Sequence, residues 1–283
     1  MPNGVRVCSA AHCSINDPVI YAICQELHLP AGYPVLSNDG AGACTCSCSC
    51  LAFGTGVQAG DESFKAIETY AEGEQVLASG TSLAWQPAPV VFSSGTSVAS
   101  QQPDTVLIVY ETNTILVTSD HLFLVRDEND EMTLLRADRL TTEDNLVSPQ
   151  GEWVSIQSVH IGTYYSGFHN IVATSTDPPG EDLEGHLLNT QDIISGDYLL
   201  QLQARQDEAV PSFSRGNLER PPLGSPEYRE EHGDSHIEAP DLPDSFRQQM
   251  DIEVTPFNAP DLPPGTFVPF GALQVQVPPN AAS

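Results

Sequence analysis

The stretch CLAFGTGV, residues 50–57, marks the point at which the character of this 283-residue sequence changes. Its first residue, Cys50, is the last of seven cysteines. Over residues 50–203, short runs of Val, Ile, Leu and Thr, such as 105–110 and 198–200, are separated by turn-forming residues, a pattern typical of strands. No stretch there carries a long helical period. We therefore predict one all-β domain of many short strands over residues 50–203.

Residues 1–49 form a leader that holds the other six cysteines. Because seven is odd, at least one thiol cannot sit in an intramolecular disulfide. Cys44, Cys46, Cys48 and Cys50 stand at alternate positions, so in an extended strand their side chains face one side and can hold a soft metal ion, zinc or copper(I), as thiolates. No paired C-x-x-C motif with distant partners accompanies them. A flexible Cys/Ser linker is the simpler interpretation, and the metal site stays open as the alternative.

Residues 204–283 form an acidic tail that is rich in proline and poor in large apolar residues. The segment APDLP occurs twice, at 239–243 and 259–263. Proline at this density removes hydrogen-bond donors and resists regular structure, so we predict a disordered tail. The repeat is a candidate docking motif for a partner that the sequence does not identify.

The charge balance narrows the range of partners. The chain has 38 acidic and 10 basic residues, a formal net charge of −28, which argues against binding to nucleic acid or to an anionic membrane. The sequence contains no run of 18 apolar residues, so we predict no transmembrane helix. The N-terminus also lacks the charged start and apolar stretch of a signal peptide. We expect no nucleic-acid or membrane partner, and the sequence leaves the compartment open.

Four short motifs occur in order within the predicted domain. After CLAFGTGV come EGEQVLA at 72–78, LVTSDHLF at 116–123, and ADRL at 137–140 followed by DNLV at 144–147. Together they resemble the Hint domain, the self-processing module shared by inteins, Hedgehog C-terminal regions and bacterial intein-like proteins. The first motif resembles the nucleophile strand, and the second resembles a G-D-x-V-L-A strand in which Glu74 replaces the usual Asp. The third resembles the block that carries the family's catalytic Thr and His.

The resemblance implies a flat, all-β horseshoe with pseudo-twofold symmetry, whose ends meet at the active site. It also implies that Cys50 is the nucleophile and that Thr118 and His121 are the catalytic pair. A thiolate at Cys50 can capture the carbonyl of Ser49 and turn the Ser49–Cys50 amide into a thioester, an N–S acyl shift. His121 is then expected to protonate the departing nitrogen as a residue that titrates near neutral pH. Thr118 is expected to bind the scissile peptide or the oxyanion.

The far end of the motif set predicts which reaction follows the thioester. In HLLNTQDIISGDY, residues 186–198, Gly196 and Asp197 stand where inteins have His-Asn, and Tyr198 replaces the acceptor. Aspartate cyclises less readily than asparagine and a phenol is a poor receiver of a thioester, so splicing is not expected. The stretch VFSSGT, residues 91–96, lacks the acid that activates cholesterol in Hedgehog-type domains. We expect water or a small nucleophile to resolve the thioester, with His186 and Asp197 as candidate helpers.

The sequence therefore predicts a protein that cleaves itself once, in cis, with its own N-terminal segment as the substrate and without a cofactor. Residues 1–49 are released with a new C-terminus at Ser49. Two alternatives remain. The first is a binding module in which the leader cysteines and Cys50 hold a metal ion. The second is a Hint domain that has lost catalysis and serves as an interaction scaffold.

Overall fold

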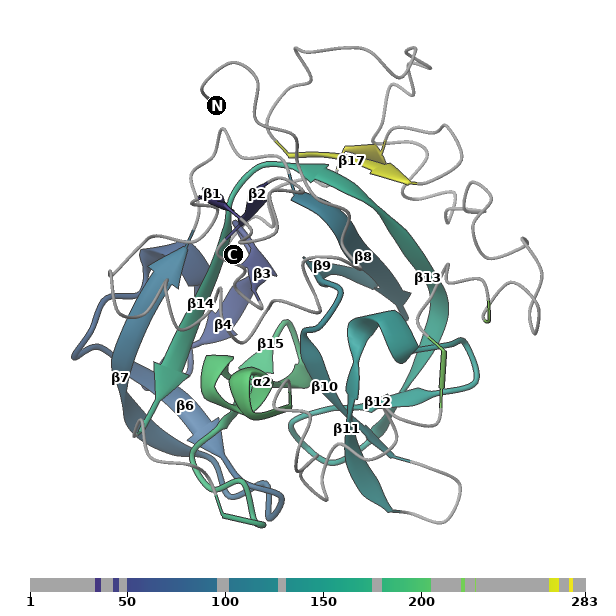
Figure 1. Cartoon of the computed structure of the whole chain (residues 1–283). Helices are drawn as coiled ribbons and strands as arrows, with labels where there is room; N and C mark the ends of the chain where they lie inside the picture. Colours follow the sequence, from purple (N-terminus) through teal and green to yellow (C-terminus); the bar gives the residue numbers. More distant parts are fainter. Residues whose placement is uncertain are drawn as a thin grey trace.

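The computed structural model describes residues 34–36, 43–45, 50–95, 102–126, 131–174, 180–204, 220–221, 227, 265–269 and 275–276. In chain order the elements are β1 (Pro34–Leu36), β2 (Ala43–Thr45), β3 (Leu51–Ala52), β4 (Gly56–Gln58), β5 (Phe64–Ala66), η1 (Ile67–Thr69), β6 (Gln75–Ser79), β7 (Gln86–Gly95), β8 (Gln102–Tyr110), β9 (Asn113–Thr118), β10 (Leu122–Arg126), β11 (Met132–Arg136), η2 (Ala137–Arg139), β12 (Asn145–Val147), β13 (Trp153–Tyr165), β14 (Phe168–Ala173), β15 (Leu187–Thr190), β16 (Ile193–Gly196), α2 (Tyr198–Ala204), β17 (Thr266–Pro269) and β18 (Val275–Gln276). The predicted all-β class is confirmed (Figure 1). The run at residues 198–200, which the sequence pattern predicts as a strand, is instead the start of helix α2.

One antiparallel sheet carries the domain, with its main path in the order β11-β10-β12-β13-β8-β9-β3-β14-β7-β6-β15-β4-β5. The hairpin β15–β16 connects the two sides of this path, because β15 pairs with β6 and β4 while β16 pairs with β10. The sheet therefore curves back on itself (Figure 1). Strands β3 and β9, which carry the first and third motifs, lie side by side in the middle of the path.

The pseudo-twofold symmetry that the resemblance implies is visible in two copies of one unit. In the first copy, strand β5 leads through helix η1 to β6, and in the second β11 leads through η2 to β12. Each 3-10 helix ends in the same hydrogen bond, since the N–H of Tyr70 returns to the oxygen of Ile67 and that of Leu140 returns to Ala137. These two units are a local repeat of the kind that the predicted symmetry requires, and the symmetry of the whole domain stays a prediction.

The same acid position closes the turn in both copies. Glu74 accepts a hydrogen bond from the N–H of Ala71 at 2.7 Å, and Asp144 accepts one from the N–H of Thr141 at 2.8 Å. Each acid also pairs with a cation, Glu74 with Lys65 and Asp144 with Arg220. Glu74 and Asp144 therefore make the same contact in equivalent turns, because the turn requires only a carboxylate oxygen. Glutamate in place of the usual aspartate at position 74 keeps this contact.

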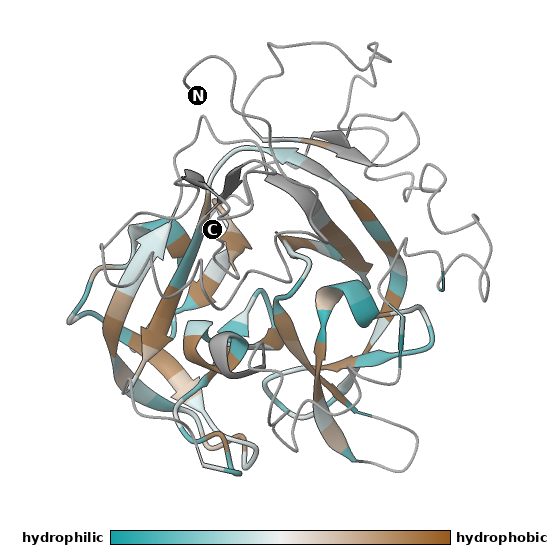
Figure 2. Cartoon of the chain, in the orientation of Figure 1, coloured by the Kyte–Doolittle hydropathy of each residue, from teal (hydrophilic) through white to brown (hydrophobic). Residues whose placement is uncertain are grey.

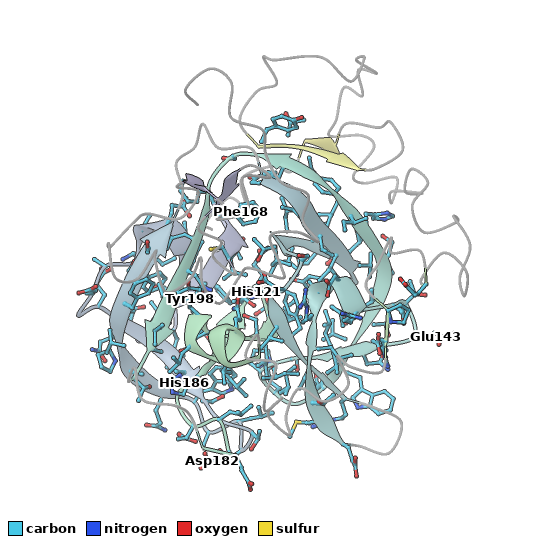
Figure 3. The ribbon with its side chains drawn as sticks, in the orientation of Figure 1. His121, Glu143, Phe168, Asp182, His186 and Tyr198 are labelled. Atoms are coloured by element: carbon cyan, nitrogen blue, oxygen red, sulfur yellow. The ribbon has the colours of Figure 1, made fainter. Side chains whose placement is uncertain are left out.

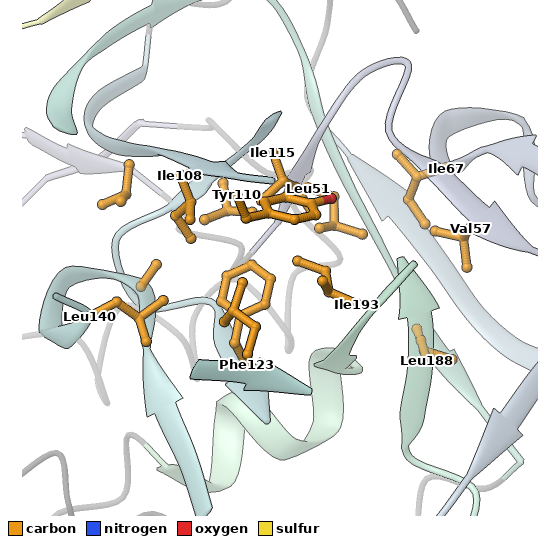
Figure 4. Packing of buried hydrophobic residues seen from close by; sticks show 14 of the residues in the cluster. Leu51, Val57, Ile67, Ile108, Tyr110, Ile115, Phe123, Leu140, Leu188 and Ile193 are labelled. Carbon is orange, nitrogen blue, oxygen red and sulfur yellow. The ribbon is translucent and has the colours of Figure 1, made fainter. Parts of the chain in front are cut away.

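The core consists of buried side chains on both faces of the sheet. Strand β8 shows this alternation, because Ile108 and Tyr110 face the largest cluster while Leu107 faces a smaller one that contains Cys50. A strand that is covered on both faces reads as a continuous apolar run, as residues 106–110 of β8 do. Figure 2 shows apolar residues along the inner strands, and Figure 4 shows Tyr110, Phe123, Ile115 and Ile193 packed together.

The tail departs from the prediction of disorder at residues 266–269, which form strand β17, and at 275–276, which form β18. Strand β17 pairs with β13, and its Phe267 is fully buried in the small cluster with Cys50. The sequence TFVP combines β-branched and aromatic residues, and pairing with a strand edge together with burial of one aromatic ring outweighs the proline-rich surroundings. Both APDLP repeats lie outside the described residues.

The leader contributes strands β1 and β2, which pair with each other on either side of residues 37–42. Within the described part of the chain, no helix is long and apolar enough to cross a membrane. The boundaries at 49/50 and 203/204 remain predictions.

Candidate active site

Cys50 and Thr118 contact each other through two hydrogen bonds. The N–H of Cys50 donates to Oγ1 of Thr118 at 2.9 Å, and the N–H of Thr118 donates to the oxygen of Cys50 at 3.0 Å. The pairing of β3 with β9, where Leu51 lies opposite Val117, brings the two residues together. The amide nitrogen that would leave in an N–S acyl shift is therefore held by the hydroxyl that the sequence motif predicts.

The Cys50 side chain is fully buried, in the cluster with Phe168 and Phe267. Its sulfur forms a disulfide bond, whereas the nucleophile that the resemblance implies at this position requires a free thiol. The other six cysteines all precede Cys50 in the sequence. An intramolecular disulfide partner of Cys50 is therefore one of the leader cysteines. A disulfide sulfur is not a nucleophile, since only the thiolate attacks a carbonyl. Ser49, the other half of the predicted scissile bond, lies outside the described residues.

His121 lies in the same turn as Thr118, because its N–H donates to the oxygen of Thr118 at 3.1 Å. Its ring is fully buried and packs edge-on against Phe123 with 5.2 Å between ring centroids. Burial lowers the pKa of His121 to about 3, so the expectation that it titrates near neutral pH is wrong for this structure. Removal from water disfavours the charged ring. At neutral pH His121 therefore acts as a neutral imidazole.

His186 and Asp197 form a second, separate group. Nδ1 of His186 lies 2.8 Å from Oδ2 of Asp197, and both side chains are buried. The same oxygen accepts the N–H of Ala173 at 3.1 Å, and Oδ1 accepts those of Leu199 and Leu200 at 3.1 and 3.2 Å. Burial raises the pKa of Asp197 above its ordinary value, against the lowering effect of these bonds. Asp197 therefore anchors the start of helix α2, as a helix N-cap does.

Gln201 of helix α2 connects the two groups, and the sequence motifs did not point to it. Its Nε2 lies 3.0 Å from Nδ1 of His121 and 3.0 Å from the oxygen of Gly196. Its backbone N–H donates to the oxygen of Asp197 at 3.4 Å. Figure 3 shows His121 beside this helix, with Tyr198 and His186 nearby. The candidate site therefore comprises the Cys50–Thr118 pair, His121, and the capped helix that holds His121.

The metal alternative involves residues that are mostly not described. Cys46 and Cys48 lie outside the described residues, and for Cys44 only the backbone is described. Cys50 is disulfide-bonded in this structure, and a disulfide sulfur cannot serve as a thiolate ligand. Among the side chains that the structure describes, no group of three or more His, Cys, Asp or Glu residues is arranged to hold a metal ion.

No protein-family model and no curated protein matches the sequence. Solved structures to which the chain is similar include a bacterial intein-like domain from Clostridium thermocellum, with 16% identity, a TM-score of 0.43, and coverage of 53% of this chain and 100% of that one. A DnaB intein from Synechocystis sp. PCC 6803 has 17% identity, a TM-score of 0.40, and coverage of 53% and 98%. The gp41-1 intein has 16% identity, a TM-score of 0.38, and coverage of 53% and 100%. They are inteins and an intein-like domain, the class of protein that the sequence motifs resemble.

Proposed function

We propose that this protein is a Hint-type autoprocessing protein that cleaves its own chain between Ser49 and Cys50. The observation that carries this proposal is the hydrogen bond from the Cys50 N–H to Oγ1 of Thr118 at 2.9 Å. An acceptor at this atom fixes the orientation of the scissile amide before the reaction, and positioning of the reacting groups is a large source of rate acceleration. The same bond joins the nucleophile motif to the Thr-x-x-His motif.

The reaction begins with an isomerisation. Sγ of Cys50 bonds to the carbonyl carbon of Ser49, the bond from that carbon to the Cys50 nitrogen breaks, and the thiol proton ends on the nitrogen. In the second step water adds to the thioester, the carbon–sulfur bond breaks, and the sulfur regains a proton. The products are residues 1–49 with a free carboxyl group at Ser49 and a chain that begins with the free amine of Cys50. The net reaction is hydrolysis of one peptide bond.

A reduction must come before the first step, because Cys50 carries a disulfide. Two electrons from a thiol or phosphine reductant break the S–S bond and give two thiols. On this proposal the disulfide-bonded state is a precursor, because the disulfide blocks the Cys50 thiol. Self-cleavage is expected only after exposure to a reductant.

The far end of the site favours cleavage on the N-terminal side alone. Cyclisation at Asp197 would require its carboxyl group to leave its bonds with His186, Ala173 and helix α2. Tyr198 stacks on Phe92 with 5.5 Å between ring centroids. A side chain at Gly196, where inteins have histidine, would meet Leu200 and Leu122 at 3.2 and 3.4 Å. These contacts support hydrolysis of the thioester and not splicing.

The test is the intact mass of the full-length protein after incubation with and without tris(2-carboxyethyl)phosphine, a reductant that contains no thiol. We expect no change without the reductant and loss of residues 1–49 with it. Hydroxylamine attacks thioesters, so its addition should accelerate the loss and leave a hydroxamate at Ser49. A fully reduced protein that keeps its full mass in hydroxylamine would contradict the proposal and would favour the scaffold alternative.

Replacing Thr118 with valine is expected to lower the rate of release about 10²-fold, the usual cost of removing one positioned hydrogen-bonding group at a reacting centre. Valine keeps the shape and removes Oγ1, so the Cys50 N–H loses its partner. The first-order rate in reductant measures the effect. The control is Thr114→Val on the same strand β9, at a half-buried position away from Cys50. Equal rates for the two variants would show that the Thr118 hydroxyl does not serve the reaction.

A further inference from the structure

Helix α2 determines which nitrogen of His121 carries the proton. Nε2 of Gln201 is within hydrogen-bond distance of two groups, Nδ1 of His121 and the oxygen of Gly196. A side-chain amide nitrogen has two N–H donors and no acceptor. Because the carbonyl oxygen of Gly196 can only accept, and Nε2 can only donate, Nδ1 of His121 must also accept. The proton of the neutral ring is then on Nε2.

The opposite orientation of the Gln201 amide is excluded by its neighbours. Exchanging Nε2 and Oε1 would place one carbonyl oxygen against the oxygen of Gly196, where both are acceptors. The present orientation leaves Oε1 buried and without a partner in the described part of the chain. A buried oxygen without a partner costs free energy, because its hydrogen bonds to water are not replaced. The two hydrogen bonds that Nε2 donates therefore outweigh the cost of burying Oε1 without a partner, and they determine the orientation of the Gln201 amide.

Nε2 of His121 is, like Oε1 of Gln201, a buried polar atom without a hydrogen-bond partner in the described part of the chain. This nitrogen is buried, and no residue that the structure describes accepts a hydrogen bond from it. His121 lies in one turn with Thr118, whose hydroxyl holds the Cys50 nitrogen. A buried N–H donor without an acceptor is suited to stabilise negative charge that develops during a reaction.

We propose that Gln201 is a positioning residue that fixes the proton of His121 on Nε2, so that the neutral ring presents this N–H as a hydrogen-bond donor during the proposed cleavage at Cys50. The inference rests on the proposed function for the role of that N–H. It makes helix α2, which follows the Asp197 position where an intein would end, a working part of the N-terminal cleavage site. It also gives His121 a role as a neutral donor, in keeping with the burial that lowers its pKa to about 3.

The first measurement reads the tautomer directly and does not depend on cleavage. Ring ¹⁵N chemical shifts of His121 are recorded by NMR in full-length Cys50→Ala, which keeps residues 1–49 attached. We expect the shifts of a neutral ring with the proton on Nε2. In Gln201→Glu a carboxylate faces Nδ1, and a carboxylate only accepts, so we expect the proton to move to Nδ1. A ring with its proton on Nδ1 in the presence of Gln201, or shifts that do not change in the Gln201→Glu variant, would overturn the proposal.

The second measurement is the rate of release in the protein with Cys50 intact, in reductant, from pH 5.5 to 8. Gln201→Ala is expected to be about tenfold slower, because the tautomer is no longer fixed. Gln201→Glu is expected to be slower at pH 8 and to approach the wild-type rate as the pH falls. A carboxylate favours the imidazolium, which has a proton on Nε2 as well. A purely structural role of Gln201 would give a rate loss with the same pH profile as the wild type.

The matched control is Gln157, an exposed glutamine whose Nε2 donates to the oxygen of Glu111. Gln157→Ala and Gln157→Glu repeat both changes away from His121 and are expected to leave the rate, its pH profile and the His121 shifts unchanged. The two arms also separate the claims. If the proton is on Nε2 and depends on Gln201, but the protein never cleaves, the proposed function is wrong and the positioning role of Gln201 still holds. If the protein cleaves at the same rate in the Gln201 variants, the positioning role is wrong and the proposed function still holds.

Discussion

Replacing Cys50 with alanine is expected to abolish release of residues 1–49 under all conditions, because the methyl side chain has no nucleophile to form the thioester. Alanine fits the site, since Cys50 is fully buried in an apolar cluster and makes its contacts with Thr118 through the backbone. The measurement is the intact mass after incubation with phosphine and hydroxylamine. Thermal unfolding, followed by circular dichroism, checks that the variant is folded. Release at the wild-type rate would mean that the scissile bond or the nucleophile lies elsewhere.

Serine at the same position makes the expectation sharper. Its hydroxyl can form an ester by the corresponding N–O shift, but a hydroxyl is a much weaker nucleophile at neutral pH, so release should be slower by about 10²-fold or more. Serine cannot form a disulfide. Whatever cleavage Cys50→Ser retains should therefore be independent of the reductant, in contrast to the wild type. A residual rate that still depends on phosphine would place the redox requirement at another pair of cysteines.

Replacing Asp197 with alanine is expected to lower the free energy of unfolding by about 3–5 kcal/mol, the usual result when one partner of a buried pair is removed. Four groups lose their acceptor together, namely Nδ1 of His186 and the N–H groups of Ala173, Leu199 and Leu200. Helix α2 loses its N-cap in the same change. Chemical denaturation of Cys50→Ala and of the double variant, neither of which is expected to cleave, measures the difference.

Asp182→Ala provides the control. Asp182 is an exposed aspartate whose side chain accepts one N–H, that of Glu184, at 3.4 Å, and a surface change of this kind is usually within about 0.5 kcal/mol. Figure 3 shows Asp182 at the periphery of the molecule. A loss at Asp197 no larger than the loss at Asp182 would show that the carboxylate is not the anchor of α2.

The contact between Cys50 and Thr118 could be predicted because both residues lie in local motifs. Cys50 opens one motif, Thr118 belongs to another, and the pairing of two short strands brings them together. The all-β class followed from short β-branched runs between turns, and the repeated strand–turn–strand unit agrees with what the resemblance implies. These features depend on residues near each other in the sequence or on a pattern that repeats.

Gln201 could not be predicted because its role depends on the type of a short element. Residues 198–204 read YLLQLQA, seven residues that are too few for a helical period to be distinguished from a strand. The helix forms there because Asp197 caps it, and Asp197 is itself held by His186 and Ala173 from other parts of the sheet. Likewise the burial that makes His121 neutral comes from the whole fold. The state of Cys50 depends on pairing among seven cysteines, which spacing alone does not determine.

Strand β17 has a consequence for how the domain can be isolated. A chain shortened at residue 203 would retain every predicted catalytic residue, yet it would lose the strand that pairs with residues 162–165 of β13. The backbone N–H and C=O groups of that long strand would then face solvent, together with the apolar surface that Phe267 covers. An open, apolar strand edge is a template for pairing with other copies. Strand β17 covers this edge of β13, so a domain shortened at residue 203 is expected to self-associate more readily than the full-length chain.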